Sequence, residues 1–334
     1  MSKLNASDLV VVTGAGGFIG GHLVSELRQR GHTRIRAVDC KPFDEWYQRF
    51  DGVDNLVLDL READACQTAA RESRYIFNLA ADMGGMGFIE LNKAACMLTV
   101  LINTHMLMAA RSAGTERFFY SSSACVYAAE KQTSADVQPL RVGDAYPAMP
   151  EDGYGWEKLF SERMCRHFTE DFGLTTRMAR YHNVYGPLGT YDGGREKAPA
   201  AICRKVIQAQ LSRSNEIEIW GDGEQTRSFT YIDDCLEGTL LLTESEVVEP
   251  LNIGSDQLVT INQLVDIVEN IAGVKLRRRY KLDAPKGVRG RNSDNTLIKQ
   301  RLGWAPSISL EHGMRKTYDW IHQQMTTAGR RQYA

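Results

Sequence analysis

Near its N-terminus the chain reads Thr13-Gly14-Ala15-Gly16-Gly17-Phe18-Ile19-Gly20, and this stretch decides the fold. An apolar, β-branched run over residues 9–13 precedes it, and an amphipathic helical pattern over residues 18–30 follows it. Glycine allows a tight strand-to-helix turn and lets backbone N–H groups approach a pyrophosphate at the helix N-terminus. Gly14, Gly17 and Gly20, with Phe18 and Ile19 between them, therefore predict a dinucleotide-binding turn.

An acidic residue, Asp39, closes the next predicted strand, which covers residues 34–38. A carboxylate in that position accepts hydrogen bonds from the adenosine ribose diol and repels a 2′-phosphate. The sequence therefore predicts NAD as the cofactor and not NADP. Asp59 follows the third predicted strand, residues 55–58, where a side chain can meet the adenine ring; an ordinary turn residue is an equal alternative there.

Strands and helices alternate outward from this turn. Further strands are expected at residues 75–79, 117–121 and 175–179, and helices at residues 62–72, 89–112 and 152–171. Alternation of this kind predicts a parallel sheet with helices on both faces, because each parallel connection must cross over the sheet. The expected fold class is therefore α/β, a Rossmann-type doubly wound parallel sheet.

The pattern loosens beyond residue 182. A loop rich in Gly, Pro and Asn is expected at residues 183–194, with later strands at 217–220 and 251–253 and helices at 261–271 and 310–323. We predict an NAD-binding Rossmann domain over residues 1–182. A smaller mixed α/β C-terminal lobe for the substrate covers residues 183–330 and is interleaved with the first domain.

Composition excludes several classes of protein. Apolar residues make up 43% and charged residues 25%, as in an average globular protein, and the formal net charge of −2 provides no basic field for nucleic acid. The seven cysteines are odd in number and widely spaced, which argues against disulfides or a metal site and for a reducing compartment; six are expected in the core. No apolar run approaches the roughly 20 residues of a membrane helix, and the N-terminus lacks a signal-peptide pattern. We expect a cytoplasmic protein without membrane or nucleic-acid partners.

Two motifs suggest catalysis. Ser121-Ser122-Ser123-Ala124-Cys125 follows the fifth strand, and Tyr154-Gly155-Trp156-Glu157-Lys158 opens the next helix. A tyrosine and a lysine four residues apart lie on one helix face. A nearby ammonium lowers the pKa of a phenol, so Tyr154 can take a hydroxyl proton while hydride leaves to nicotinamide. Lys158 can also hold the nicotinamide ribose.

Together these features resemble the extended short-chain dehydrogenase/reductase superfamily of NAD-dependent epimerases and dehydratases. A finer resemblance, to the GDP-mannose 3,5-epimerase family, rests on long runs at residues 78–88, 122–125, 193–200, 221–229 and 288–294. The likeness covers nearly the whole chain, from the first strand to Trp304-Ala305-Pro306, without a departure at a motif position. It is therefore far more specific than the superfamily motifs.

The resemblance implies an isomerase that converts GDP-D-mannose to GDP-L-galactose, with GDP-L-gulose as the product of inversion at C5 alone. Transient oxidation at sugar C4 acidifies the hydrogens at C3 and C5, and re-reduction at C4 ends the cycle, so NAD is recycled. The two acid/base groups implied for the enolate steps are Cys125 and Lys197. Each needs a pKa well below its usual value, which a neighbouring cation and partial burial can provide.

The resemblance also implies residues that bind the sugar nucleotide. Arg291 corresponds to a phosphate-clamping arginine, for which a planar guanidinium is suited, and Arg289 is close enough in sequence to share that role. For each single arginine, a surface ion pair is the alternative. The other implied contacts, including backbone approach at two glycines, are Gly84, Gly85, Ser123, Ala124, Cys125, Asn183, Glu196, Lys197, Ala198, Lys205, Gln225, Thr226 and Arg227.

Two alternatives share the cofactor turn and the Tyr–Lys pair. One is another sugar-nucleotide enzyme: a 4,6-dehydratase needs a carboxylic acid where this chain has Ala124-Cys125, and a 4-epimerase needs neither Cys125 nor Lys197. The other is a non-catalytic NAD-bound regulator, whose expected sign is loss of Tyr154, Lys158 or Cys125. A homodimer through the long helices expected at 89–112 and 152–171 follows from fold analogy alone. The sequence leaves open the order of inversion, the product ratio and which group is the base at each centre.

Overall fold

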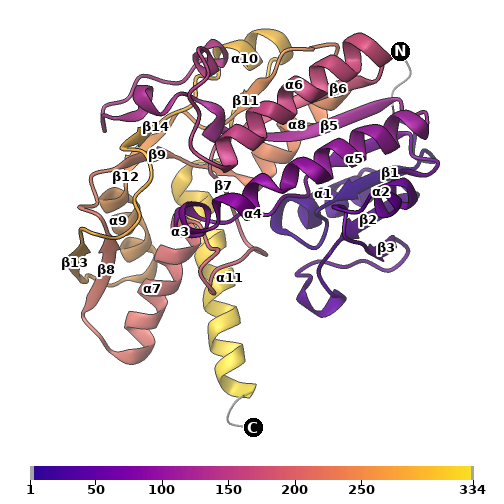
Figure 1. Ribbon diagram of the computed structural model, residues 1–334. Coiled ribbons are helices and arrows are strands. Elements are labelled where there is room, and N and C mark those ends of the chain that lie inside the picture. Colours follow the sequence, from indigo (N-terminus) through magenta and orange to yellow (C-terminus); the bar gives the residue numbers. More distant parts are fainter. Residues whose placement is uncertain (1–3, 332–334) are drawn as a thin grey trace.

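The computed structural model describes residues 4–331, with side chains to residue 327. Residues 1–3 and 332–334 lie outside this range. The first residues of the predicted NAD-binding domain, where no signal peptide is expected, are therefore not described. Figure 1 shows a sheet flanked by helices, joined to a second, smaller group of strands and helices.

The large sheet has seven parallel strands in the order β11-β6-β5-β4-β1-β2-β3. This confirms the Rossmann-type doubly wound sheet. The order reverses between β1 and β4, which is where such sheets bind ligands beyond the strands' carboxyl ends. The strands are β1 (Val10–Thr13), β2 (Ile35–Asp39), β3 (Asp54–Val57), β4 (Tyr75–Asn78), β5 (Arg117–Ser123), β6 (Thr175–Tyr181) and β11 (Leu251–Ile253).

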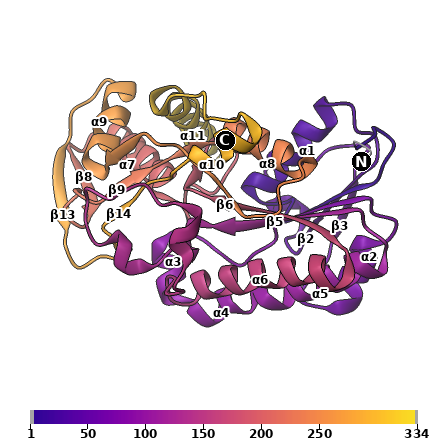
Figure 2. The same ribbon diagram turned by 90° about the horizontal axis from the view of Figure 1, so that it is seen from above.

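Helices cover both faces of this sheet (Figure 2). One core contains Val11, Ile76 and Phe118 with α2 (Ala63–Ala70), α5 (Thr99–Ser112) and α6 (Tyr154–Phe172). The other contains Val10 and Phe77 with α1 (Phe18–Gln29) and α8 (Ile232–Glu244). Successive strand residues alternate between the two cores because side chains point to opposite faces of a strand, and both faces are buried.

The helix expected over residues 89–112 is three helices: α3 (Met86–Leu91), α4 (Lys93–Met97) and α5. Asn92 breaks it with φ −128° and ψ 42°, which is not helical. By length and composition alone, Lys93–Ser112 is long and apolar enough to cross a membrane. The expectation that no segment approaches the length of a membrane helix was therefore wrong. One such helix is weak evidence for a membrane span, and α5 packs against α2 and α6 in the sheet's helical layer.

Three short sheets lie outside the large sheet in the described chain, and the smallest is the parallel pair of β7 (Val184–Tyr185) and β10 (Thr230–Tyr231). β8 (Glu216–Trp220) pairs in parallel with β13 (Arg277–Lys281), and β9 (Thr226–Ser228) lies between β12 (Leu258–Thr260) and β14 (Gly290–Arg291). Helices α7 (Ala198–Ser212), α9 (Ile261–Ala272) and α11 (Leu310–Arg331) pack together beside them. The remaining short elements are α10 (Thr296–Leu302), η1 (Phe43–Glu45), η2 (Ala124–Val126), η3 (Ala129–Gln132) and η4 (Val142–Ala145).

Late segments of the chain return to the large sheet. β11 is its edge strand beside β6, and α8 packs on the same sheet, although both lie beyond residue 182. Segments beyond residue 182 thus contribute to the large sheet, while the division into two domains at residues 182 and 183 stays a prediction. α8 was not predicted; nine of its 13 residues are buried, so the exposed polar face formed by Asp233, Glu237 and Glu244 is narrow.

Candidate active site

A cavity of about 990 Å³ lies at the carboxyl ends of β1, β2, β4 and β5. This is close to the upper end of the range of roughly 300–1,000 Å³ seen for small-molecule and cofactor sites. All nine residues predicted to bind the cofactor line it: Gly14, Gly17, Phe18, Ile19, Gly20, Asp39, Asp59, Tyr154 and Lys158. The residues present therefore fit a dinucleotide.

The glycine turn is built for close backbone approach. Gly14 has φ +70°, a conformation that L-residues with side chains rarely adopt. A Cβ atom on Gly20 would lie 2.2 Å from the Gly14 carbonyl oxygen, so only glycine fits where α1 begins to pack on the turn. The turn thus presents backbone N–H groups and the N-terminus of α1 to the cavity.

Two acidic residues lie at the cavity's adenosine end. Asp39 Oδ2 accepts a hydrogen bond from Gly16 N at 3.0 Å and Oδ1 accepts one from Lys41 N at 3.0 Å, which orients the carboxylate toward the expected ribose position. Asp59 is paired with Arg61 at 2.5 Å, and this hydrogen bond lowers the pKa of Asp59. Asp39 therefore has the geometry expected of a ribose ligand, whereas Asp59 is engaged by its neighbour.

Tyr154 and Lys158 are buried at the start of α6 (5% and 1% exposed). Lys158 Nζ donates to the Ser121 carbonyl at 3.0 Å and lies 5.5 Å from the centre of the Tyr154 ring. Burial, with Cys125 and Glu157 adding to it, raises the pKa of Tyr154 well above its usual value, while a hydrogen bond with Ser123 acts in the opposite direction. The pKa of Tyr154 therefore moves in the direction opposite to the expected lowering by Lys158, because desolvation is the largest effect.

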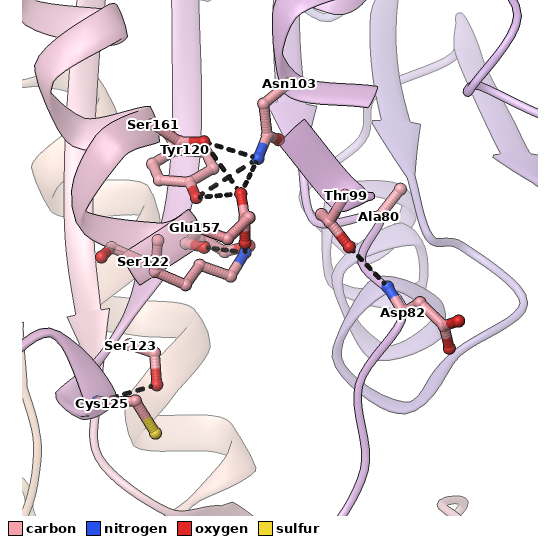
Figure 3. A network of polar contacts seen from close by, with 12 residues as sticks. Ala80, Asp82, Thr99, Asn103, Tyr120, Ser122, Ser123, Cys125, Glu157 and Ser161 are labelled. Carbon is pink, nitrogen blue, oxygen red and sulfur yellow. Dashed lines mark hydrogen bonds and ion pairs between the residues drawn. The ribbon is translucent and has the colours of Figure 1, made fainter. Parts of the chain in front are cut away.

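Cys125 lies in η2, directly after β5, where its N–H donates to Ser123 Oγ at 3.2 Å (Figure 3). A Cβ on Gly155 would lie 2.4 Å from the Cys125 carbonyl oxygen, so the start of α6 packs on this segment. The Sγ atom accepts a hydrogen bond from Arg291 Nη1 at 3.6 Å. Cys125 is only 7% exposed; six of the seven cysteines are buried, the expected number, and the exposed one is Cys40.

Lys197 reaches the same cavity from a different part of the chain. It is the residue before α7, and it lines the cavity with Tyr154 and Lys158. The preceding loop crosses the segment after β4: Gly85 N donates to the Arg195 carbonyl at 3.0 Å. Burial lowers the pKa of Lys197, and Cys125 acts in the opposite direction. Lys197 thus lines the cofactor cavity with Tyr154 and Lys158, whereas Cys125 packs in one cluster with Tyr154 and is not among the residues that line this cavity.

The other predicted substrate residues divide into two groups. Gly84 and Ser123 line the cavity, and Gly85, Ala124, Asn183, Glu196 and Ala198 lie in the segments around it. Asn183 Nδ2 donates to the Ser228 carbonyl at 2.9 Å, and Glu196 pairs with Arg204 at 2.8 Å. The second group lies on the small lobe and consists of Lys205, Gln225, Thr226, Arg227 and Arg291.

The arginines of the small lobe differ in how they are engaged. Arg291 donates from Nε to Gln132 Oε1 at 2.7 Å, from Nη1 to Cys125 and from Nη2 to Glu151, so each nitrogen already has an acceptor. Arg289 forms an exposed pair with Asp222 at 2.8 Å, the surface alternative foreseen for it.

Arg227 is different, because its buried guanidinium donates only to backbone carbonyls, those of Thr226, Lys286 and Val288. Within residues 4–331 it has no ion pair with a carboxylate, and burial lowers its pKa to about 10. Next to it, Gln225 Oε1 is a buried acceptor that has no partner in the described part of the chain. Arg227 therefore differs from Arg289 and Arg291 in that its described acceptors are all neutral carbonyls, and it is not among the residues that line the cavity.

Lys205 and Thr226 are held by carbonyls. Lys205 Nζ donates to the Glu218 carbonyl at 2.9 Å and lies 5.6 Å from the Trp220 ring centre, and burial lowers its pKa. Thr226 Oγ1 donates to the Ala135 carbonyl at 2.6 Å, which ties the small lobe to the segment after η3.

Sequence reasoning missed the buried polar residues behind the site. Glu162 accepts from Ser122 Oγ at 2.5 Å and from Arg180 Nη2 at 2.7 Å, which fixes the carboxyl ends of β5 and β6. Glu157 lies between Tyr154 and Lys158 and accepts from two neighbouring elements (Figure 3). A signal existed: Glu157 is three residues after Tyr154 and so lies on the buried helix face, where a charge is unusual.

Comparison with known proteins agrees with this geometry. Residues 10–254 match the NAD dependent epimerase/dehydratase family. The chain is 49% identical over 317 residues to GDP-mannose 3,5-epimerase 1 of Oryza sativa subsp. indica, covering 95% of this chain and 82% of that protein. It is 48% identical over 317 residues to GDP-mannose 3,5-epimerase of Arabidopsis thaliana, with the same shares covered. Among solved structures, UDP-glucose 4-epimerase of Thermotoga maritima with UDP-glucose superimposes with a TM-score of 0.83 at 26% identity, covering 95% and 99% of the two chains.

These findings confirm the expected family, fold and cofactor. The match covers more than half of the chain, the relatives are similar along nearly all of it, and the residues of the cavity fit a dinucleotide. The chain belongs to the NAD-dependent epimerase/dehydratase family, and within that family it is similar to the GDP-mannose 3,5-epimerases.

Proposed function

We propose that this chain is an isomerase that converts GDP-D-mannose to GDP-L-galactose and, by inversion at C5 alone, to GDP-L-gulose. The observation that carries the proposal is that Lys197 lines the cavity with Tyr154 and Lys158, while Cys125, 72 positions earlier, packs in one cluster with Tyr154. Two acid/base groups besides the tyrosine are what a double inversion needs.

The first step takes place at sugar C4. Tyr154 removes the proton from the C4 hydroxyl, and Ser123 lies beside the phenol to hold the same hydroxyl. Lys158 orients the nicotinamide ribose from its position against the Ser121 carbonyl. NAD supplies the positively charged acceptor that takes the C4 hydride and later returns it.

The second step takes place at C3 and C5, whose hydrogens are acidic beside the C4 ketone. A base removes one proton to give an enolate, and an acid on the opposite face of the ring delivers another. Cys125 and Lys197 fill these roles because they approach from different segments, η2 and the N-terminus of α7. Burial lowers the pKa of Lys197, which brings the amine toward the range where it can accept a proton.

The nucleotide occupies the side of the cavity toward the small lobe. Arg227 binds phosphate oxygens because its guanidinium has no carboxylate partner among residues 4–331. Arg291 can bind phosphate only if Nη2 exchanges Glu151 for a phosphate oxygen. The unpartnered Gln225 Oε1 accepts from the nucleoside.

The test is incubation of GDP-mannose with the holoenzyme in D₂O. Deuterium should enter both C3 and C5 of the sugar, measured by NMR and mass spectrometry of the recovered nucleotide. Absence of deuterium at both positions, with bound NAD verified, would overturn the proposal. Turnover of another sugar nucleotide without such exchange would favour a 4-epimerase, and no turnover of any sugar nucleotide would favour the non-catalytic regulator.

Two variants assign the acid/base groups. Cys125→Ala and Lys197→Ala should each reduce exchange by roughly 10²- to 10⁴-fold, the usual range for general acid–base groups. Oxidation at C4 should survive in both, seen as absorbance of reduced cofactor at 340 nm. Full exchange in either variant removes that residue from the chemistry and leaves the family assignment intact. Which position loses exchange in each variant assigns the base.

We propose a homodimer through the helical layer formed by α4, α5 and α6. Exposed apolar side chains lie at helical spacing along α4 and α5, at Leu98, Leu101 and Met108. The neighbouring helix α6 also exposes apolar side chains, at Trp156 and Phe160. Contiguous apolar surface of this kind marks protein interfaces. Sedimentation velocity should give twice the 37.5 kDa chain mass, and a monomer at micromolar concentration would contradict the proposal.

We propose a cytoplasmic location. All seven cysteines are free thiols, six of them buried, and this agrees with a reducing compartment. Fractionation of cells that express the tagged chain would test it, and recovery in a secreted or membrane fraction would contradict it.

A further inference from the structure

The carboxylate of Glu157 lies beside Lys158 of the Tyr154–Lys158 pair, and Figure 3 shows Glu157 among its hydrogen-bond donors. Glu157 is 2% exposed. Its Oε1 atom accepts hydrogen bonds from Asn103 Nδ2 at 2.5 Å and from Ser161 Oγ at 2.8 Å. Its Oε2 atom is buried and has no hydrogen-bond partner within residues 4–331. Buried polar atoms are nearly always satisfied, so this acceptor needs an explanation.

The unpartnered oxygen faces Lys158. Nζ lies 4.0 Å from Glu157 Oε2, and the two side chains are 1% and 0% exposed. The one hydrogen-bond acceptor of Nζ among the described residues is neutral, the Ser121 carbonyl. A buried ammonium requires a counter-charge, since leaving an ion uncompensated in the interior is strongly unfavourable.

The other groups around Lys158 do not supply this charge. Glu162, one turn further along α6, is held by Arg180 at 2.7 Å and so is already neutralised. From β5, Tyr120 presents its ring at 4.9 Å. Cys125 and Cys165 contribute only when ionised, and burial raises the pKa of Cys165 well above its usual value. Glu157 is left as the carboxylate that compensates Lys158.

A chain of amides holds Glu157 in this orientation. Asn103, on α5, accepts from Asn78 Nδ2 at 2.8 Å while it donates to the carboxylate. Asn78, at the end of β4, in turn accepts from Thr13 Oγ1 at 2.8 Å. Thr13 is the last residue before the glycine turn. The carboxylate is thus positioned by the same strand ends that form the cofactor cavity.

We propose that Glu157 is a positioning residue for the hydride step: it is the counter-charge that keeps Lys158 protonated beside Tyr154, and it sets the pH range in which this pair works. The inference rests on the proposed function, because it concerns proton transfer at sugar C4. Glu157 acts through Lys158 and needs no contact with the sugar or with NAD.

The sign of the effect follows from the two neighbours. Burial lowers the pKa of Lys158, and the negative charge of Glu157 opposes this. The same charge adds to the effect of burial in raising the pKa of Tyr154. Removing it lowers both pKa values. Because the pair needs an ionised tyrosine and a protonated lysine, both limbs of its pH profile must move to lower pH.

The experiment compares the pH dependence of kcat/KM in the wild-type holoenzyme and in Glu157→Gln, which keeps the shape and loses the charge. We expect both limbs to move by about one unit or more toward acid, equivalent to at least a tenfold loss at the alkaline end. Ser161→Ala is the matched comparison, since it removes a hydrogen bond to the same carboxylate and leaves the charge; its limbs should move much less than those of Glu157→Gln. Glu157→Asp keeps the negative charge on a shorter side chain, so its pH profile should lie between those of the wild type and Glu157→Gln.

A lower maximum in Glu157→Gln with unmoved limbs would overturn the inference, because a purely structural role predicts that result. If Glu157→Gln does not fold, Asn103→Leu replaces it: loss of the donor destabilises the ionised carboxylate, and the limbs should move the same way by a smaller amount. Unmoved limbs in that variant would also count against the inference.

A second readout needs no substrate. Titration of tyrosinate absorbance at 295 nm, taken as the difference between the enzyme and its Tyr154→Phe variant, should move to lower pH in Glu157→Gln. If the wild-type enzyme does not turn over GDP-mannose, the proposed function fails and this titration still decides the inference. If turnover occurs and neither readout moves, the inference alone fails.

Discussion

The cofactor half and the nucleotide half of this site are built in opposite ways. The cofactor half comes from consecutive motifs at the ends of parallel strands, and all nine residues predicted for it line one cavity. The nucleotide half comes from short strands of the small lobe, and there Arg227 lacks a carboxylate partner within the described chain while Arg291 is occupied by Glu151. A motif that is contiguous in sequence carries its geometry with it, whereas a site assembled from distant segments depends on how each side chain is engaged.

The largest expected effect comes from the turn itself. Gly20→Ala puts a Cβ 2.2 Å from the Gly14 carbonyl oxygen, and backbone atoms cannot yield cheaply. NAD affinity should fall at least about 100-fold, equivalent to about 2.7 kcal/mol, measured by calorimetry. Binding of GDP-mannose should change little, and circular dichroism checks the fold. A loss of both affinities to the same degree would show that the two halves are not separable.

An intermediate effect is expected in the small lobe. Arg227→Gln removes a buried cation from the proposed phosphate site, and hydrogen bonds to charged groups contribute about 1.5–3 kcal/mol, so KM for GDP-mannose should rise roughly 10- to 100-fold. NAD affinity should not change. The matched control is Arg279→Gln, whose exposed pair with Glu218 should contribute little. Equal KM values for the two variants would place the phosphates elsewhere.

The smallest effect is expected at Asp39. Asp39→Asn keeps one acceptor for the ribose and for Gly16 N, so NAD affinity should fall only about tenfold, or about 1.4 kcal/mol. The affinity for NADP should rise, because the negative charge that repels a 2′-phosphate is gone. Competition binding of the two cofactors measures the ratio, and an unchanged ratio would mean that another group sets the preference.

Much of the fold could be predicted because local patterns agree with the tertiary arrangement. The strands from β1 to β6 were expected within a few residues of where they lie, and so were α1, α2 and α6. The break at Asn92 and the buried helix α8 were not, since the first depends on packing after β4 and the second has only a narrow polar face, formed by Asp233, Glu237 and Glu244.

The sequence by itself determined the glycine turn, Asp39, the Tyr154–Lys158 spacing and, by resemblance, Cys125 and Lys197. These are statements about residue type and about neighbours along one chain segment, which helix and strand periodicity translate directly into position. Only the tertiary structure decided the protonation environment. Desolvation raises the pKa of Tyr154, Asn103 of α5 holds the Glu157 carboxylate, and Glu151 occupies Arg291. Each fact depends on burial or on a partner from a distant segment. The protonation state of each group depends on those surroundings, and the spacing of residues along the chain does not predict them.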